Sequence, residues 1–264
     1  MFSRFPGARL KVNRADKHLR ELAADIKRFN KSNAYSVSFE PHHKAGEYVF
    51  RVYVDRPPPT IEWGIVIGDV VHNLRSALDQ LVWEMADSES GPAPEGRIAR
   101  SSPWHDVGFP IVTDPSHWKD AAKKIVRVGP RYSAAFESLQ PWFRREAEPL
   151  RDPLAILQEL SNRDKHRAVN LTIGYVRLVD FQTFGYRWHL MSEATLGPLE
   201  DQAEIARVRV EDPDFDPAEM DVYFHDSLDV TFREGEPAYG EPVIRLLDRL
   251  EQEVVRIIWK FQSL

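Results

Sequence analysis

The stretch IEWGIVIGDVVHNLRSALDQLVWEMA, residues 61–86, decides the fold. Its apolar residues recur at intervals of three and four, which is the spacing of one face of an α-helix. That face comprises Val70, Val71, Leu74, Ala77, Leu78, Leu81 and Met85. Charged and polar residues interrupt the stretch too often for a membrane span. The stretch therefore predicts a long, amphipathic helix of a soluble protein.

The segments on either side of this helix predict both helices and strands. Further helices are predicted over residues 13–29, 152–163 and 242–261, with short ones near 116–125 and 130–137. Strands are predicted over residues 35–39, 47–54, 171–181, 186–191, 205–210, 222–224 and 228–232. Asp152 followed by Pro153 is a strong helix start, because Asp caps a helix and Pro suits its first turn.

This order of elements is typical of an α+β fold, in which helices 61–86, 152–163 and 242–261 form a core packed with an antiparallel sheet. We expect one domain over residues 1–264. Its helix-rich part, residues 1–168, contains a β-hairpin at 35–54; a β-rich part, 169–235, and the C-terminal helix, 242–261, follow. Residues 87–115, rich in Ser, Pro and Gly, predict a long loop.

Composition excludes several classes of protein. The chain has 264 residues and a net charge of −6, so contact with a nucleic acid would have to be local. It has no cysteine, which excludes disulfides, thiolate-bound metals and a cysteine nucleophile. The first residues lack the apolar stretch of a signal peptide, and we expect a cytoplasmic protein. No glycine-rich phosphate loop or metalloprotease motif occurs, and no cofactor is predicted.

The first candidate site is the side of helix 61–86 opposite the apolar face. Its polar residues are Asp69, His72, Ser76 and Asp79, with Asn73 and Gln80 beside them. Arg75 and Asp79 are four residues apart and are predicted to pair. A solvated polar face is the alternative interpretation of the same pattern.

The second candidate site is LQELSNRDKHR, residues 157–167. On a helix, Asp164 falls in the same stripe as Leu154, Leu157, Leu160 and Ser161. A carboxylate at the end of an apolar stripe must find a partner or shift its pKa. We expect Asp164 to be buried against Arg75 or His72. The same pairing has a purely structural interpretation, an ion pair that joins two helices.

Four motifs carry a resemblance to a known family. GDVVHNLRSALDQL at 68–81, FPIV at 109–112, LQPW at 139–142 and ELSNRDKHR at 159–167 resemble, in order and spacing, a widespread family of bacterial and phage proteins. The likeness spans residues 13–170. The family has no established activity, so the resemblance informs the fold more than the function.

A looser resemblance is to HEPN domains, helical bundles that are often ribonucleases of toxin–antitoxin and phage-defence systems. Their signature places an Arg, a polar residue and then a His a few positions on. Here Arg163 and His166 are only three residues apart, and His72 precedes Arg75. The spacing and order of these residues therefore depart from the signature.

The enzymatic interpretation is metal-independent RNA cleavage. His72 or His166 would act as general acid or base, and Arg75, Arg163 or Arg167 would stabilise the extra negative charge of the phosphorane. Lys165 and Arg167 would attract phosphate. A metal-dependent variant, a hydrolase, would use His72, Asp79, Asp164 and His166 as ligands, although their spacing matches no metal motif.

The non-enzymatic interpretation, which we favour on the residues alone, is a binding or assembly protein. HNLRSALD and NRDKHR would then form a structural polar clamp, in which Asp164 pairs with Arg75 and Asn162 closes a helix end. Asn73, Asp79, Asn162, Lys165 and Arg167 are its candidate binding residues. The partner is RNA or another protein. The C-terminal helix is a candidate homodimer seam, because its apolar residues exceed one narrow stripe: Val254, Val255, Ile257, Ile258, Trp259 and Phe261.

Overall fold

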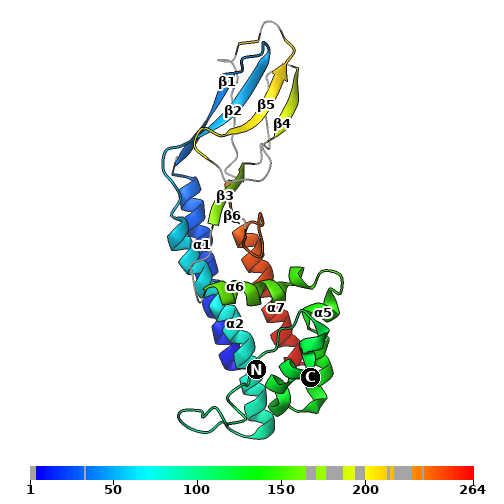
Figure 1. The fold of residues 1–264 in the computed structure, drawn as a ribbon. Coiled ribbons are helices and arrows are strands. Elements are labelled where there is room, and N and C mark those ends of the chain that lie inside the picture. Colours follow the sequence, from blue (N-terminus) through cyan, green and yellow to red (C-terminus); the bar gives the residue numbers. More distant parts are fainter. Residues whose placement is uncertain are drawn as a thin grey trace. The chain divides into compact units, whose positions relative to one another are not determined.

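A computed structural model describes most of the chain. The described residues are 4–32, 34–164, 171–176, 187–193, 200–212, 215–216, 228–233 and 235–264. They combine α-helices with antiparallel strands, so the predicted α+β class is confirmed (Figure 1). Of the predicted strands, 177–181 and 222–224 lie outside the described residues.

The chain divides into two compact units, and each unit takes segments that are far apart in the sequence. The helical unit comprises residues 1–21, 64–169 and 244–264. The sheet unit comprises residues 22–63 and 170–243, and therefore contains the hairpin that the sequence places within a helix-rich part. One cooperative domain stays a prediction of the sequence.

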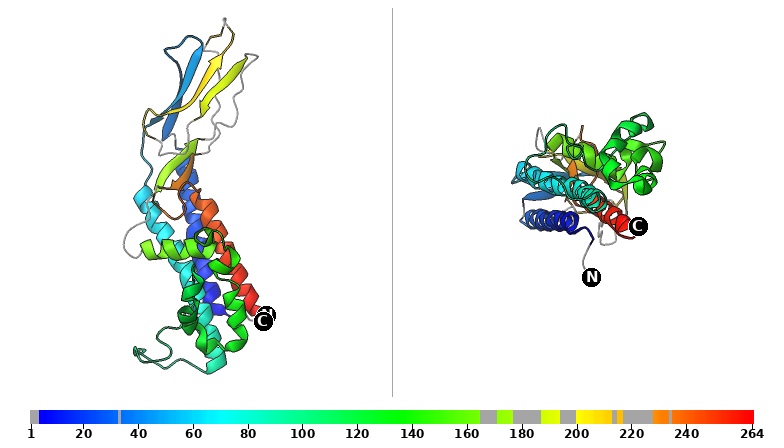
Figure 2. Two further views of the ribbon diagram at one scale, coloured as in Figure 1. Left: turned by 45° about the vertical axis from the view of Figure 1, so that its right-hand side comes forward. Right: turned by 90° about the horizontal axis from the view of Figure 1, so that it is seen from below.

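The helical unit is built around four longer helices: α1 Pro6–Asn30, α2 Thr60–Ser90, α6 Pro153–Asp164 and α7 Val243–Gln262. In this unit α1, α2 and α7 run alongside one another, and α6 crosses α2 (Figures 1 and 2). The predicted apolar face of α2, from Val70 to Met85, is at most 1% exposed. That face forms the centre of the core because its helical spacing presents it to the other helices.

Helix α1 begins seven residues before the position that the sequence predicts, at Pro6 rather than Asn13. Its apolar stripe continues toward the N-terminus through Val12 and the small residue Ala8. The side chain of Glu84 on α2 accepts hydrogen bonds from the backbone N–H groups of Gly7, at 2.7 Å, and Ala8, at 3.3 Å. A carboxylate at a helix N-terminus satisfies free N–H groups and complements the helix dipole, which explains the early start.

Between α2 and α6 the chain forms a loop and then a series of short helices. These are η1 Pro115–His117, α3 Trp118–Ala121, η2 Ala122–Val128, η3 Pro130–Tyr132, α4 Ser133–Glu137, α5 Pro141–Arg144 and η4 Pro149–Arg151. Phe109 and Phe136 from this region are fully buried, with ring centroids 5.5 Å apart. The region therefore contributes to the core of the helical unit.

The sheet unit contains two antiparallel sheets. The larger has the strand order β1-β2-β5-β4, formed by β1 Tyr35–Pro41, β2 Glu47–Val54, β5 Glu204–Val210 and β4 Trp188–Glu193. The smaller pairs β3 Leu171–Val176 with β6 Leu228–Phe232. The predicted hairpin is confirmed, with Tyr35 opposite Val54 and Pro41 opposite Tyr48. Its alternating residues Phe50 and Val52 are buried in the core of the larger sheet.

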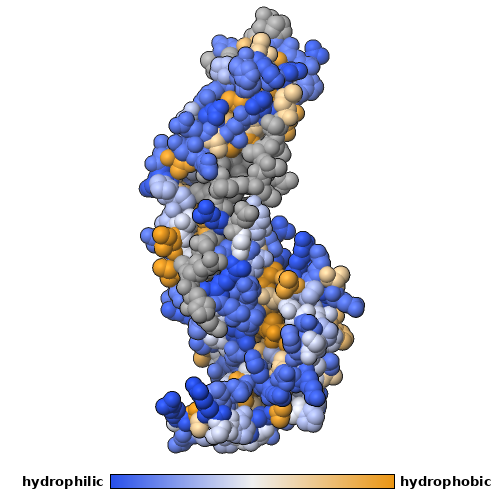
Figure 3. Space-filling model, in the orientation of Figure 1, coloured by the Kyte–Doolittle hydropathy of each residue, from blue (hydrophilic) through white to orange (hydrophobic). Residues whose placement is uncertain are grey.

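No helix among the described residues is long and apolar enough to cross a membrane. In the view of Figure 3 the surface of the helical unit is mostly hydrophilic, with scattered hydrophobic residues. Large hydrophobic side chains of this unit with more than half of their surface exposed include Leu10, Ile65, Val126, Phe143, Leu150 and Trp259.

Candidate functional site

Arg75 on α2 is the centre of a polar cluster formed with Asp79, Gln158 and the backbone of Phe109, which we call the clamp. Unlike the clamp that the sequence predicts, it does not contain Asp164. Its Nη1 donates to Asp79 Oδ1 at 2.9 Å, which confirms the predicted pair one helical turn apart. Its Nη2 donates to the backbone oxygen of Phe109 at 2.9 Å, and Asp79 Oδ1 also accepts from the backbone N–H of Phe109 at 2.9 Å. Two charged side chains thus hold one backbone position of the loop.

The close approach of this loop to α2 depends on a glycine. A Cβ at position 108 would lie 2.9 Å from Asp79 Oδ1, which is closer than side-chain contacts allow. Gly108 therefore lets the backbone of Phe109 reach both Asp79 and Arg75. The motif FPIV and the motif HNLRSALD are joined through this contact.

Helix α6 joins the clamp through Gln158. Arg75 Nε donates to Gln158 Oε1 at 3.1 Å, and Gln158 Nε2 donates to Asn162 Oδ1 at 2.9 Å. Each of the three guanidinium nitrogens of Arg75 therefore donates a hydrogen bond to an acceptor within the protein. Only 14% of the Arg75 side chain is exposed, so these charge-assisted bonds are partly shielded from water.

Gln140, from the motif LQPW, holds the other end of the FPIV segment. This fully buried side chain accepts from the backbone N–H of Val112 at 2.9 Å through its Oε1. Its Nε2 donates to the backbone oxygens of Pro110, at 3.1 Å, and Phe136, at 2.9 Å. Residues 109–112 are therefore held from two sides, by side chains of α2 and by Gln140, the residue that precedes α5 Pro141–Arg144.

Asp164 does not pair with Arg75, so this part of the prediction is wrong. Its side chain lies against the backbone of Gly68 instead, where a Cβ would be 2.8 Å from the Asp164 carboxyl carbon. The reason is the path of α6 across α2. That path brings Gln158 to Arg75 and Asp164 to Gly68, about two turns nearer the N-terminus of α2.

The surroundings of Asp164 disfavour its charged form. Burial raises the pKa of this carboxyl, the nearby carboxylate of Asp69 raises it further, and His72 acts in the opposite direction. Asp164 is half-buried, whereas the sequence led us to expect a buried carboxylate. The predicted meeting of the two polar segments is confirmed, with Asp69 and His72 rather than Arg75 beside the carboxylate.

His72 is exposed on α2, and its Nε2 lies 3.4 Å from Ser76 Oγ one turn later. Asn73 uses its side chain to donate to the backbone oxygen of Asp69 at 2.8 Å. Asp69, His72 and Asp164 therefore form a second, more open cluster, separate from the clamp. Lys165, His166 and Arg167 lie outside the described residues.

The metal-dependent interpretation depends on His72, Asp79, Asp164 and His166. Asp79 belongs to the clamp, while His72 and Asp164 belong to the open cluster. Within the part of the chain that the structure describes, no group of three or more His, Asp or Glu side chains is arranged to hold a metal ion. His166, the fourth proposed ligand, lies outside the described residues.

The sequence reasoning missed a third polar cluster, around Asp152. This carboxylate is 1% exposed, accepts from Arg144 Nε at 3.0 Å, and caps α6 by accepting from the backbone N–H of Leu154 at 2.9 Å. Arg144 also pairs with Glu253 on α7. Asp152 was recognised as a helix cap, but no sequence spacing connects it to Arg144 and Glu253.

Comparison of the chain with protein-family models, with curated proteins and with solved structures found no match in any of the three.

Proposed function

We propose that this chain is a binding or assembly protein in which the polar segment HNLRSALD is structural. The observation that supports the proposal is the engagement of Arg75: its guanidinium bonds to Asp79, Phe109 and Gln158. A catalytic arginine needs donors aimed at the reacting group. The donors of Arg75 are aimed at the protein itself, which suits a residue that fixes a loop between two helices.

The motifs of the resembled family support the same proposal. GDVVHNLRSALDQL supplies Arg75 and Asp79, FPIV supplies the backbone that they hold, and LQPW supplies Gln140. ELSNRDKHR follows Gln158, the remaining partner of Arg75. A framework held in this way is rigid, and rigid frameworks suit the presentation of a binding surface.

A second candidate function is metal-independent RNA cleavage at the open cluster of Asp69, His72 and Asp164. The observation in its favour is a carboxyl with a raised pKa next to an exposed histidine, an arrangement found at many acid–base sites. In this reaction the 2′-oxygen of a ribose would attack the phosphorus of the phosphodiester on the adjacent 3′-oxygen. The P–O2′ bond forms and the P–O5′ bond breaks, while the base takes the 2′ proton and the acid protonates the leaving 5′ oxygen.

The two functions separate in one assay. Purified full-length chain is incubated with total RNA, with and without EDTA, beside the variants His72→Ala and His166→Ala. His105→Ala, at an exposed histidine of the loop, is the matched control. The binding proposal expects intact RNA in every lane. Cleavage that disappears in His72→Ala or His166→Ala and persists in His105→Ala would establish the ribonuclease instead, and sensitivity to EDTA would identify a metal requirement.

A further inference from the structure

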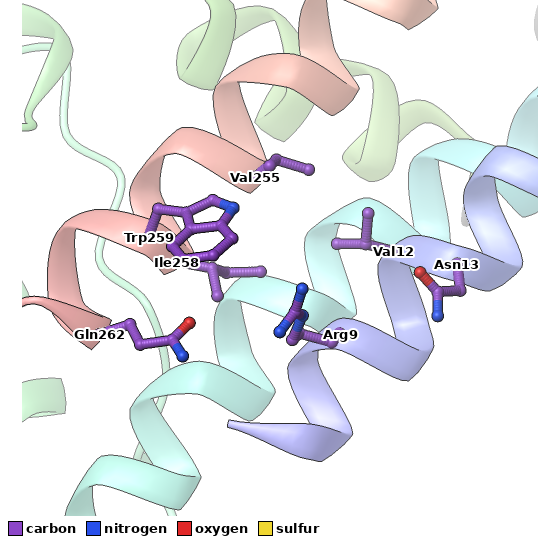
Figure 4. Close-up of a pocket in the computed structure, with 7 residues that line it drawn as sticks. All are labelled: Arg9, Val12, Asn13, Val255, Ile258, Trp259 and Gln262. Carbon is purple, nitrogen blue, oxygen red and sulfur yellow. The ribbon is translucent and has the colours of Figure 1, made fainter. Parts of the chain in front are cut away.

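A shallow groove lies between α1 and α7 of the helical unit. Figure 4 shows its lining, which includes Arg9 and Val12 from α1 and Val255, Ile258 and Trp259 from α7. Trp259 is 55% exposed, although Val254, Ile257 and Phe261 of the same helix are fully buried. The guanidinium carbon of Arg9 lies 5.4 Å from the centroid of the Trp259 ring. An exposed tryptophan with an arginine against it is typical of an interface anchor.

The size of the groove limits what binds there. Its volume is about 90 Å³, whereas pockets for small ligands and cofactors usually measure about 300–1,000 Å³. A space of this size suits one inserted side chain. The occupant is therefore a protein surface that contributes a knob to the groove.

Along the seam between these two helices, a group of carboxylates follows Arg9. Arg9 lies at the groove, near the start of α1 and the end of α7. Asp16, Asp248 and Glu251 lie together further along the antiparallel pair, beside Arg20. Arg9 and Asp16 are separated by about 10 Å along α1. The seam thus has a basic end with an apolar groove and an acidic end.

The acidic end brings the three carboxylates of Asp16, Asp248 and Glu251 together beside Arg20. Arg20 pairs with Asp16 at 2.7 Å. Burial, followed by the negative charges of Asp16 and Asp248, raises the pKa of Glu251, while Arg20 opposes them. A cation brought from outside would stabilise this group of carboxylates.

We propose that this seam is the interface between two copies of the chain, related by a two-fold axis. In such an interface the same patch appears on both partners, so the basic end of one copy faces the acidic end of the other. Arg9 would then reach the partner's acidic end, and the inner edge of the groove, at Val12 and Val255, would meet its equivalent near the axis. The inference rests on the proposed binding or assembly function and names its partner.

The charge pattern favours a second copy over a nucleic acid. A polyanion would be attracted by Arg9 but repelled by Asp16, Asp248 and Glu251, and the chain as a whole carries a charge of −6. Only a partner with alternating charges of the same spacing satisfies both ends. A second copy of the chain has that spacing because it carries the same residues.

The test is sedimentation of the full chain over a range of concentrations, which measures self-association. It compares wild type with variants in which one charge is reversed and with a double variant in which the two charges are exchanged. Arg9→Glu and Asp248→Arg each place like charges face to face, so each is expected to weaken self-association at least about tenfold. Arg9→Glu combined with Asp248→Arg restores opposite charges across the interface and is expected to recover most of the loss. Trp259→Ser is expected to weaken association, and adding the charge exchange Arg9→Glu with Asp248→Arg is not expected to restore it.

Arg14→Glu is the matched control, because Arg14 is exposed and lies about 140° around α1 from Arg9. It is expected to leave association unchanged. Thermal unfolding of every variant checks that the fold is kept. The proposal is overturned if the wild-type chain remains monomeric up to about 100 μM, or if neither reversal changes the dissociation constant. Either result leaves the clamp and the RNA assay untouched, so the two proposals fail separately.

Discussion

The carboxyl group of Asp164 occupies the space that a side chain at Gly68 would need. A Cβ at position 68 would be 2.8 Å from the carboxyl carbon of Asp164. This glycine lies in the interior of α2, where glycine costs about 0.5–1 kcal/mol relative to alanine. The crossing of α6 over α2 therefore explains why a glycine stands at position 68, whereas helix propensity does not.

The contact between these residues predicts a change of sign in a double-mutant cycle. Gly68→Ala alone is expected to destabilise the protein, because the new methyl group displaces Asp164. In an Asp164→Ala background the same change is expected to stabilise it by about 0.5–1 kcal/mol, the gain in helix propensity. Urea unfolding of the four proteins measures both effects. Equal effects of Gly68→Ala in the two backgrounds would show that Asp164 does not occupy this space.

The raised pKa of Asp164 predicts a pH-dependent effect of Asp164→Asn. The folded protein binds the Asp164 proton more tightly than the unfolded chain, so its contribution to stability is present below the ordinary aspartate pKa and is lost as the pH rises through the raised value. Asparagine does not ionise, so the Asp164→Asn variant does not lose stability in this way. The variant is expected to be more stable than wild type at pH 7, by at most about 1 kcal/mol, with the difference shrinking toward pH 4.

The measurement is the difference in the free energy of unfolding between variant and wild type across that pH range. Asp106→Asn serves as the matched control, because its side chain is 80% exposed. A variant that is less stable than wild type at pH 7 would mean that the Asp164 carboxylate is stabilised in the fold.

The clamp predicts a large effect at Arg75. Arg75→Ala removes bonds to Asp79, Phe109 and Gln158 and leaves the Phe109 oxygen without its donor. The expected cost is about 2–3 kcal/mol in urea unfolding, because these partners are partly shielded from water. Arg151→Ala is the control, since Arg151 is 76% exposed and pairs only one turn away with Glu148. Its expected cost is below about 1 kcal/mol. Similar costs at the two positions would contradict the clamp.

The hydrogen bonds of Gln140 predict a comparable loss of stability in a variant that does not change the charge of the protein. Gln140→Met keeps the length of the side chain but leaves the backbone oxygen of Pro110 and the backbone N–H of Val112 without this partner. Unsatisfied buried groups of this kind cost about 1–3 kcal/mol. Gln252→Met, at an exposed glutamine that donates to Asp248, is expected to have little effect. If both variants unfold at the same urea concentration, Gln140 does not hold the loop.

The sequence contained the information for contacts within one element. Helical spacing predicted the buried face of α2, and the four-residue separation predicted the pair of Arg75 and Asp79. Alternation predicted the β1–β2 hairpin. The early start of α1 was missed, because its first turns are anchored by small apolar residues and by Glu84 from another helix. Spacing along the chain cannot show a cap that comes from elsewhere.

The tertiary structure alone decided which separate segments meet. The sequence determined that Asp164 would end an apolar stripe and approach α2, but the crossing of α6 placed it at Gly68 and placed Gln158 at Arg75. It likewise placed Arg9 beside Trp259, which are 250 residues apart in the chain. The physical reason is that periodicity fixes the face on which a side chain lies, whereas the angle and offset between packed helices fix its partner.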